Sequence, residues 1–262
     1  MNIRFRTGRR VALCAAAVLA LTASWNAEAQ GRGGRGGAAP PRTAQAAAPE
    51  DLTGYWVALV TEDWRWRMVT PPKGDVASVP LNPAGRDAAN AWDPAKDEAA
   101  GNQCKAYGAA AIMRVPTRLH ITWENETTLR IDTAAGTQTR QLHFGTEQAP
   151  AGEATWQGYS AASWDSPGGR GGRGGPPAGG SLKVVTSHMK PGYLRKNGVP
   201  YSANAVVTEY MDRTNEPDGL SYLIVTTIVE DPQYLTQPFV TSTHFKKQAD
   251  AAGWHPTPCE AR

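Results

Sequence analysis

Nine segments between residues 54 and 246 have the composition of β-strands, and most are separated by short turns rich in Gly, Asn, Asp or Pro. Helical patterns do not alternate with these segments, so a parallel sheet is disfavoured. Sequential strands of this number predict an all-β, antiparallel fold, either an up-and-down barrel or a sandwich. The predicted strands are residues 54–60, 118–124, 128–132, 136–144, 155–165, 181–189, 203–213, 220–229 and 239–246.

Residues 71–101 differ from the rest because they carry helix signals. Asn82 can cap a helix that begins at Pro83 and runs to about Trp92. Asp93 can cap a second helix that begins at Pro94 and ends before residue 101. Both follow the first strand directly, so we expect a short helical lid over the open end of a barrel.

The first 29 residues predict a secretion signal. Arginines precede an apolar run at 11–23, and Ala27-Glu28-Ala29 supplies the small-x-small pattern of a cleavage site. The run is shorter than the ~20 residues needed to span a bilayer. We therefore expect a periplasmic or secreted chain that is soluble and has no transmembrane segment once mature. Arg9-Arg10 also fits the twin-arginine route, but the flanking residues favour the general secretory route.

Composition divides the remaining chain. Residues 30–49 contain mostly Gly, Ala, Arg, Pro and Gln, which predicts disorder. Residues 50–262 are long enough for a single β-barrel domain, interrupted by a Gly-rich loop at 168–180. Because that loop separates two strand signals, we expect it at a hairpin tip, where loop length costs little. Its Arg-Gly-Gly repeats indicate a flexible, solvated loop.

The charge balance argues against a nucleic-acid partner. The chain has 27 Lys and Arg against 24 Asp and Glu, but the predicted signal holds four arginines and one glutamate. The remaining 23 basic and 23 acidic residues balance. A nucleic-acid binder needs an excess of positive charge.

Two cysteines, Cys104 and Cys259, follow the predicted signal. An even pair in an oxidising compartment indicates one disulfide, which would close a loop of about 155 residues. The alternative is two unpaired, buried thiols. Neither cysteine has a second Cys or a His at ligand spacing, so we expect no metal site built on them.

The first strand opens with a Gly-x-Trp motif and resembles the opening of lipocalin-like, or calycin, barrels. The folded part also resembles a broad group of uncharacterised secreted bacterial proteins. The calycin resemblance implies an up-and-down, lipocalin-like barrel, and the group implies no agreed activity. The motifs that carry these resemblances lie at residues 51–56, 156–160, 182–186, 197–202, 209–210 and 230–232.

Strand periodicity identifies candidate inward-facing polar groups, because side chains alternate between the two faces. If the first strand continues to Met68, Glu62 is the one carboxylate on the face that begins with Trp56. Glu209 is the one carboxylate on its strand face, and His188 ends another. A carboxylate in an apolar cavity would have a raised pKa and could act as a general acid or base.

Each of these candidates has a plainer interpretation. Glu62 can mark the strand end, Glu209 can pair with Arg or Lys on a neighbouring strand, and His188 can be a strand-end residue. If the turn between their strands is short, Glu209 lies opposite Lys183. His188 is then some 16 Å away, at roughly 3.3 Å per residue, which is too far for a dyad.

The tryptophans suggest a ligand cavity, although nine of them also suit an ordinary core. The leading hypothesis is a periplasmic lipocalin-like binding protein for a small apolar or amphipathic molecule. Its rivals are a barrel enzyme, an isomerase, lyase or hydrolase that uses Glu62 or Glu209, and a structural envelope protein without a ligand. No cofactor is expected, and protein partners are not indicated. The residues expected to line the cavity are Trp56, Trp64, Trp66, Trp156 and Trp164.

Overall fold

The computed structural model describes residues 42–145, 149, 151–165 and 180–262. The predicted signal, residues 30–41 and nearly all of the Gly-rich loop lie outside these ranges. Residues 42–49, at the end of the segment predicted to be disordered, form a turn in which the amide of Gln45 donates to Glu126 O at 3.1 Å.

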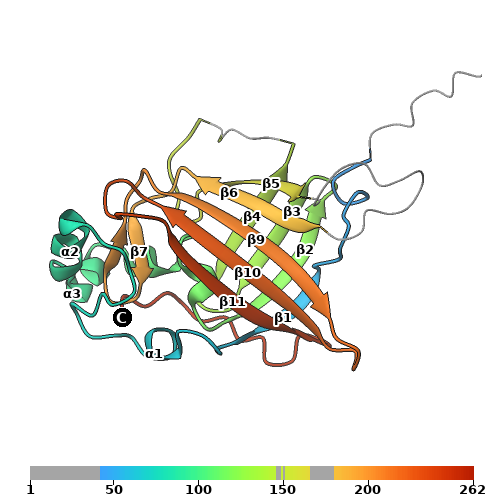
Figure 1. Cartoon of the computed structure of the whole chain (residues 1–262), viewed down its shortest axis with the longest axis horizontal. Helices are drawn as coiled ribbons and strands as arrows, with labels where there is room; N and C mark the ends of the chain where they lie inside the picture. Colours follow the sequence, from blue (N-terminus) through green and yellow to red (C-terminus); the bar gives the residue numbers. More distant parts are fainter. Residues whose placement is uncertain (1–41, 146–148, 150, 166–179) are drawn as a thin grey trace, which may run out of the picture. The chain divides into compact units, whose positions relative to one another are not determined.

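Nine strands form a closed barrel, which confirms the all-β class (Figure 1). Each predicted strand segment overlaps one barrel strand, and the boundaries differ by a few residues. Around the barrel the order is β1-β11-β10-β9-β6-β5-β4-β3-β2. The strands are β1 Gly54–Leu59, β2 Arg118–Asn125, β3 Thr128–Thr133, β4 Gln138–Phe144, β5 Tyr159–Asp165, β6 Ser181–Ser187, β9 Val206–Asn215, β10 Ser221–Glu230 and β11 Phe239–Gln248.

One neighbouring pair, β4 and β5, is parallel, while every other pair in the ring is antiparallel. A closed ring with an odd number of strands cannot alternate direction throughout, so one parallel pair is unavoidable. The strands follow one another around the ring in chain order, as an up-and-down barrel predicts, and only this pair departs from the expected antiparallel direction. The β5–β6 pair is an antiparallel hairpin, as expected for the strands that flank the Gly-rich loop.

The expected helices are present in the segment after β1. Asn82 caps α2 (Pro83–Asn90) by accepting from the amide of Gly85, and Asp93 caps α3 (Pro94–Ala99) by accepting from two amides. Three shorter pieces were not predicted: α1 (Trp64–Arg67) and the 3₁₀ turns η1 (Gln103–Tyr107) and η2 (Ile112–Arg114). No helix formed by the described residues has the length and apolar character needed to cross a membrane.

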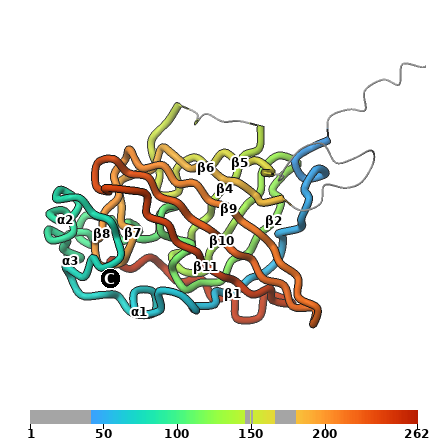
Figure 2. The backbone as a smooth tube through the Cα atoms, in the orientation of Figure 1, coloured from blue at the N-terminus to red at the C-terminus, as the bar shows by residue number. Residues whose placement is uncertain are grey.

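A second, two-stranded sheet lies between β6 and β9 in the chain and was not predicted. It consists of β7 (Gly192–Arg195) and β8 (Val199–Tyr201). This hairpin and helices α2 and α3 lie together at one end of the barrel, which we call the lid end (Figures 1 and 2). The amide of Asn82 donates there to Tyr234 O, in the β10–β11 turn.

The inward faces of the strands form an apolar core. Side chains such as Trp56, Leu119 and Phe245 are completely buried, and each stabilises the fold by about 1.5–3 kcal/mol. The indole N–H of Trp56 donates to Leu52 O at 3.0 Å, so the largest core side chain is also satisfied. Within this core lies one buried ion pair, described below.

Candidate functional site

Glu209 lies inside the barrel, where it is bound by Arg140. Two guanidinium nitrogens of Arg140 on β4 reach the two oxygens of Glu209 on β9, at 2.5 and 3.1 Å. Both side chains are fully buried. Arg140 also donates to Thr186, whose hydroxyl lies 2.8 Å from that of Ser160. β4 and β9 are separated by β5 and β6, so the pair spans the lumen instead of joining neighbouring strands.

His188 does not approach this pair. Glu209 lies opposite Val184, one position from the Lys183 that the sequence predicted. His188 follows the end of β6 in a left-handed conformation, is exposed, and places its Nε2 3.0 Å from Gly152 O. The structure therefore keeps the two candidate catalytic groups apart.

Glu62 is not on the inward face of the first strand, because β1 ends at Leu59. The extension of this strand to Met68 is wrong. Asp63 adopts a left-handed φ of 51° and starts helix α1 in its place. Glu62 then forms an ion pair with Arg67, accepts a hydrogen bond from Thr61, and lies 3.3 Å from His244 Nδ1.

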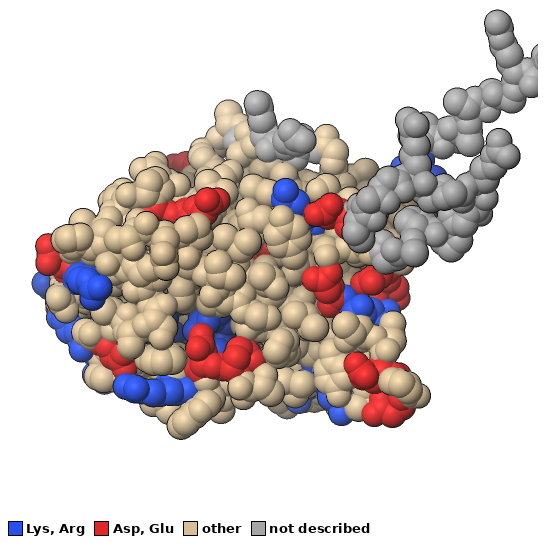
Figure 3. Space-filling model, in the orientation of Figure 1, with Lys and Arg blue, Asp and Glu red and all other residues tan. Residues whose placement is uncertain are grey.

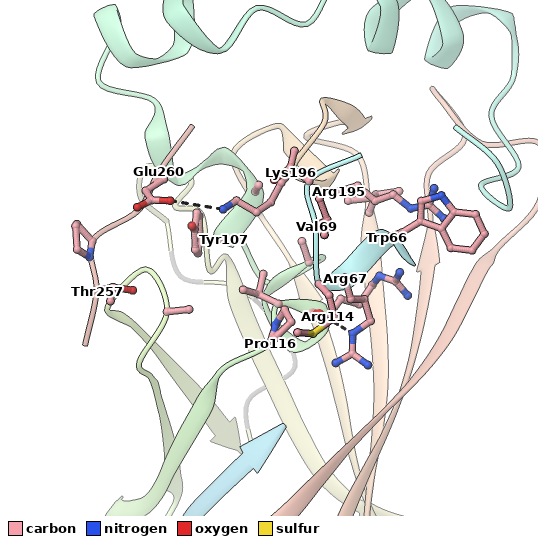
Figure 4. A pocket seen from close by; sticks show the side chains of 18 residues that line it. Trp66, Arg67, Val69, Tyr107, Arg114, Pro116, Arg195, Lys196, Thr257 and Glu260 are labelled. Atoms are coloured by element: carbon pink, nitrogen blue, oxygen red, sulfur yellow. Dashed lines mark hydrogen bonds and ion pairs between the residues drawn. The ribbon is translucent and has the colours of Figure 1, made fainter. Parts of the chain in front are cut away.

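The turn after β1 forms one wall of a cavity of about 340 Å³ at the lid end (Figure 4). Helix α1, η1, η2, β7 and the C-terminal tail all contribute to it. We call it the arginine cavity, because three of its lining residues are buried arginines. The lining consists of Trp66, Arg67, Met68, Val69, Thr70, Ala106, Tyr107, Ala111, Arg114, Val115, Pro116, Ala135, Leu194, Arg195, Lys196, Thr257, Pro258 and Glu260.

Two of the arginines have carboxylate partners. Arg67 pairs with Glu62, and Arg114 pairs with Asp63 at 3.0 Å. The Nε of Arg67 also donates to Arg114 O at 2.8 Å, which ties α1 to η2. Consecutive acidic residues in the turn after β1 thus hold two cations from different segments.

Arg195, in β7, differs from the other two because it has no carboxylate within ion-pair distance among the described residues. One of its nitrogens donates to Ala77 O at 2.8 Å. Its guanidinium lies 4.9 Å from the centre of the Trp66 ring, which Figure 4 shows on one side of the cavity. Lys196 and Glu260, 3.9 Å apart, lie on the other side.

Four guanidinium nitrogens in this group are buried and have no hydrogen-bond partner in the described part of the chain: Arg67 Nη2, Arg114 Nη2, Arg195 Nε and Arg195 Nη2. The three residues are only 8%, 6% and 4% exposed. An unsatisfied buried donor costs about 1–3 kcal/mol, and more when it is charged. The cluster therefore lowers the free energy of unfolding when no ligand is bound.

The pKa values reflect the same crowding. Burial and the nearby Arg114 lower the pKa of Arg195 to about 10, against a smaller opposing effect of Asp63 and Asp75. Burial also lowers the pKa of Arg67; Glu62 opposes this shift and Arg114 adds to it. The guanidinium charges repel one another, and the two carboxylates only partly compensate.

The predicted ligand-binding tryptophans are dispersed. Trp66 alone lines the arginine cavity, whereas Trp56 belongs to the barrel core and Trp64 is 67% exposed on α1. Trp156 lies beneath Lys190, and Trp164 packs on Phe144 and donates to Ala44 O. Their roles in binding remain predictions.

A disulfide between Cys104 and Cys259 joins two walls of the cavity. Cys104 lies in η1, next to Ala106 and Tyr107, and Cys259 lies in the tail between Pro258 and Glu260. The predicted pairing is confirmed. The tail is also held by a bond from the amide of Thr257 to Ala134 O at 2.8 Å.

The described residues contain no group of three or more His, Cys, Asp or Glu arranged to hold a metal ion. A scan against protein-family models finds no matching family, and searches of curated proteins and of solved structures find no match to this chain. The interpretation of the site therefore depends on its own geometry.

Sequence reasoning did not identify the arginine cluster. Its members come from three separate segments and follow no common spacing. One local signal was present: the acidic pair Glu62-Asp63 directly precedes an alternating Trp-Arg-Trp-Arg run at residues 64–67. An acidic pair followed closely by arginines indicates a turn in which oppositely charged side chains pair.

Proposed function

We propose that this protein binds a small amphipathic anion in the arginine cavity. The observation that carries the proposal is a cavity of about 340 Å³ lined by three buried arginines, four of whose guanidinium nitrogens have no hydrogen-bond partner among the described residues. A carboxylate, phosphate or sulfate group accepts hydrogen bonds from arginine in a bidentate geometry. One such group would satisfy these donors and offset the charge of Arg195.

The charge count supports an anion over a neutral ligand. Arg67, Arg114 and Arg195 face two compensating carboxylates, Glu62 and Asp63. The remaining charged pair, Lys196 and Glu260, is balanced by itself. The cavity thus has one positive charge in excess, and a ligand with one negative group would neutralise it.

The side chains at the rim of the cavity indicate that the ligand also has an apolar part. Met68 and Val69 line the cavity and are 58% and 69% exposed, and Trp64 nearby is 67% exposed. These are three of the four large hydrophobic side chains that stand out as exposed in the described residues. A run of exposed apolar side chains beside a pocket is typical of a binding surface.

The rival enzyme hypothesis finds less support, because both candidate carboxylates are engaged with arginines. A structural role without a ligand would leave the unsatisfied cluster unexplained.

The acidic and basic side chains are interspersed on the face shown in Figure 3, which favours a small ligand over a nucleic acid. We place this activity in the periplasm or outside the cell, as the export signal and the disulfide suggest. The resemblance to calycin barrels suggests the same class of function.

Calorimetric titration with decanoate, decyl phosphate and decanol tests the proposal. We expect at least one of the two anions to bind, and decanol to bind at least about tenfold more weakly. Arg195→Met should weaken binding of the anion by about 30-fold or more, because it removes the cavity arginine that has no ion-pair partner among the described residues.

Arg86→Met is the matched control, since Arg86 is exposed on α2 and does not line the arginine cavity. This control should bind the anion as the wild type does. Equal binding of decanol and the anions, or equal affinities of the two arginine variants, would contradict the proposal.

A further inference from the structure

A second cavity, of about 420 Å³, lies between helices α2 and α3 and the β7–β8 hairpin. Four aromatic side chains line it: Trp92, Tyr193, Tyr201 and Tyr234. Trp92 and Tyr201 are 8% and 1% exposed, so they form its floor, while Tyr193 and Tyr234 are half-buried at its sides. The arginine cavity shares none of these residues.

A hydrogen-bonded group of polar side chains without a net charge lies among these rings. Asp97 accepts from Lys105 Nζ at 2.5 Å and from the Tyr193 hydroxyl at 2.7 Å. Lys105 also lies 5.3 Å from the centre of the Tyr193 ring. This group offers donors and acceptors without a net charge, in contrast to the arginine cavity.

Two buried polar atoms of the floor have no partner among the described residues: Trp92 Nε1 and the Tyr201 hydroxyl. Buried donors of this kind are normally satisfied, and both belong to side chains that line this cavity. Burial of Tyr201 also raises the pKa of its hydroxyl, which keeps it a neutral donor.

Glycines fix the positions of the two floor residues. A Cβ at Gly198, whose φ is +84°, would come within 2.2 Å of Trp92. A Cβ at Gly192 would lie 2.6 Å from the Tyr201 hydroxyl oxygen. The hairpin therefore approaches the aromatic floor as closely as a backbone can, which holds the unpartnered donors in place.

We propose that this second cavity is a binding site for a neutral saccharide. Sugar rings present C–H faces that pack on aromatic rings, and hydroxyls that both donate and accept hydrogen bonds. The half-buried Tyr193 and Tyr234 supply the rings, and Asp97, Lys105, Trp92 and Tyr201 supply donors and acceptors. The absence of a net charge among Asp97 and Lys105 matches a neutral ligand.

The test is calorimetric titration of the mature chain with maltotriose, cellotriose and chitotriose, each up to about 10 mM. We expect at least one trisaccharide to bind. Trp92→Phe keeps an aromatic ring but removes the N–H, and Tyr193→Phe removes the hydroxyl bound to Asp97. Each should weaken binding of that sugar by about 5- to 10-fold.

Trp64→Phe is the control, because Trp64 is 67% exposed on α1 and does not line this cavity. Melting temperatures of all variants separate lost binding from lost folding, and Tyr193→Phe keeps the test valid if Trp92→Phe is unstable. Failure of all three sugars to bind, or wild-type affinity in both cavity variants, overturns the proposal. Arg195→Met should leave sugar binding unchanged, so this site and the anion site succeed or fail separately.

Discussion

The barrel lumen and the arginine cavity both bury arginine, but they compensate its charge to different degrees. In the lumen, Arg140 directs two nitrogens to one carboxylate, and only its Nε has no partner in the described residues. In the cavity, three guanidinium groups share two carboxylates and leave four nitrogens unpaired. The first arrangement leaves one nitrogen unpaired, whereas the second leaves four, which a bound anion could satisfy under the proposed function.

This difference distinguishes a buried charge that serves the fold from a buried charge that is available to a ligand. A buried pair that is complete contributes to the fold, and its removal exposes the cost of the charge left behind. A buried cluster that is incomplete reduces stability until a ligand completes it. Substitution of arginine by methionine, which has a similar apolar stem and no charge, distinguishes the two cases.

The largest expected effect is that of Arg140→Met. This change leaves Glu209 buried without its partner, which typically costs about 3–5 kcal/mol. Urea unfolding followed by tryptophan fluorescence measures the loss. Glu124→Gln is the control, because Glu124 lies at the exposed end of β2, where its carboxylate accepts from Gln141. This change should lower the free energy of unfolding by less than about 0.5 kcal/mol.

Removal of the disulfide should have the next largest effect. Cys104→Ser with Cys259→Ser opens a covalent link across 155 residues and should lower the free energy of unfolding by roughly 2–4 kcal/mol. The loss should also loosen the cavity more than the lumen, because the disulfide joins η1 to the C-terminal tail, and both of these segments line the cavity. Hydrogen exchange should accelerate in residues 103–107 and 257–260 before it accelerates in β9 and β10. Uniform acceleration over the whole barrel would contradict this assignment.

Arg195→Met should have the smallest effect on stability, and of opposite sign. It removes a buried charge that Asp63 and Asp75 compensate only in part, so we expect the free energy of unfolding to rise by about 1 kcal/mol, after allowance for the lost bond to Ala77 and for solvent screening. The same substitution should weaken anion binding by about 30-fold or more. A loss of stability comparable to that of Arg140→Met would show that the two regions do not differ.

The pH dependence sharpens this prediction. Burial holds the pKa of Arg195 at about 10 in the folded chain, below the ordinary arginine value that it has in the unfolded chain. Between these values the unfolded chain holds more protons, so the free energy of unfolding rises with pH. Below about pH 10 the cost of the buried charge is fully present. The stability advantage of Arg195→Met should therefore shrink in urea titrations above pH 10, and a constant difference would argue against the assignment.

The sequence predicted most of the barrel because strand and cap signals are local. Nine strand segments and the caps Asn82 and Asp93 needed only neighbouring residues. The extension of β1 to Met68 failed because alternation continues past Leu59, while the left-handed Asp63 turns the chain away. The β7–β8 hairpin is short, and its Asn197-Gly198 turn was noted only as a motif.

The candidate sites were less predictable, since they depend on tertiary convergence. Periodicity correctly placed Glu209 on an inward face, but it could not reveal Arg140, which comes from a strand three positions away around the ring. Arg67, Arg114 and Arg195 lie in loops and short elements where charged residues are normally solvated. Apart from the acidic pair that precedes residues 64–67, nothing in their local sequence indicates that the chain buries them together.

The closed ring has a consequence for the order of folding. β1 must pair with β11, so Thr53 and Lys247, 194 positions apart, end side by side. Hairpins such as β2–β3 and β9–β10 can form early from nearby residues, whereas closure must wait for a long search that slows folding. Cys259 lies beyond β11, so its native position beside Cys104 is fixed only when that closure is complete. We therefore expect oxidation to be a late event, one that locks a barrel already assembled instead of guiding its assembly.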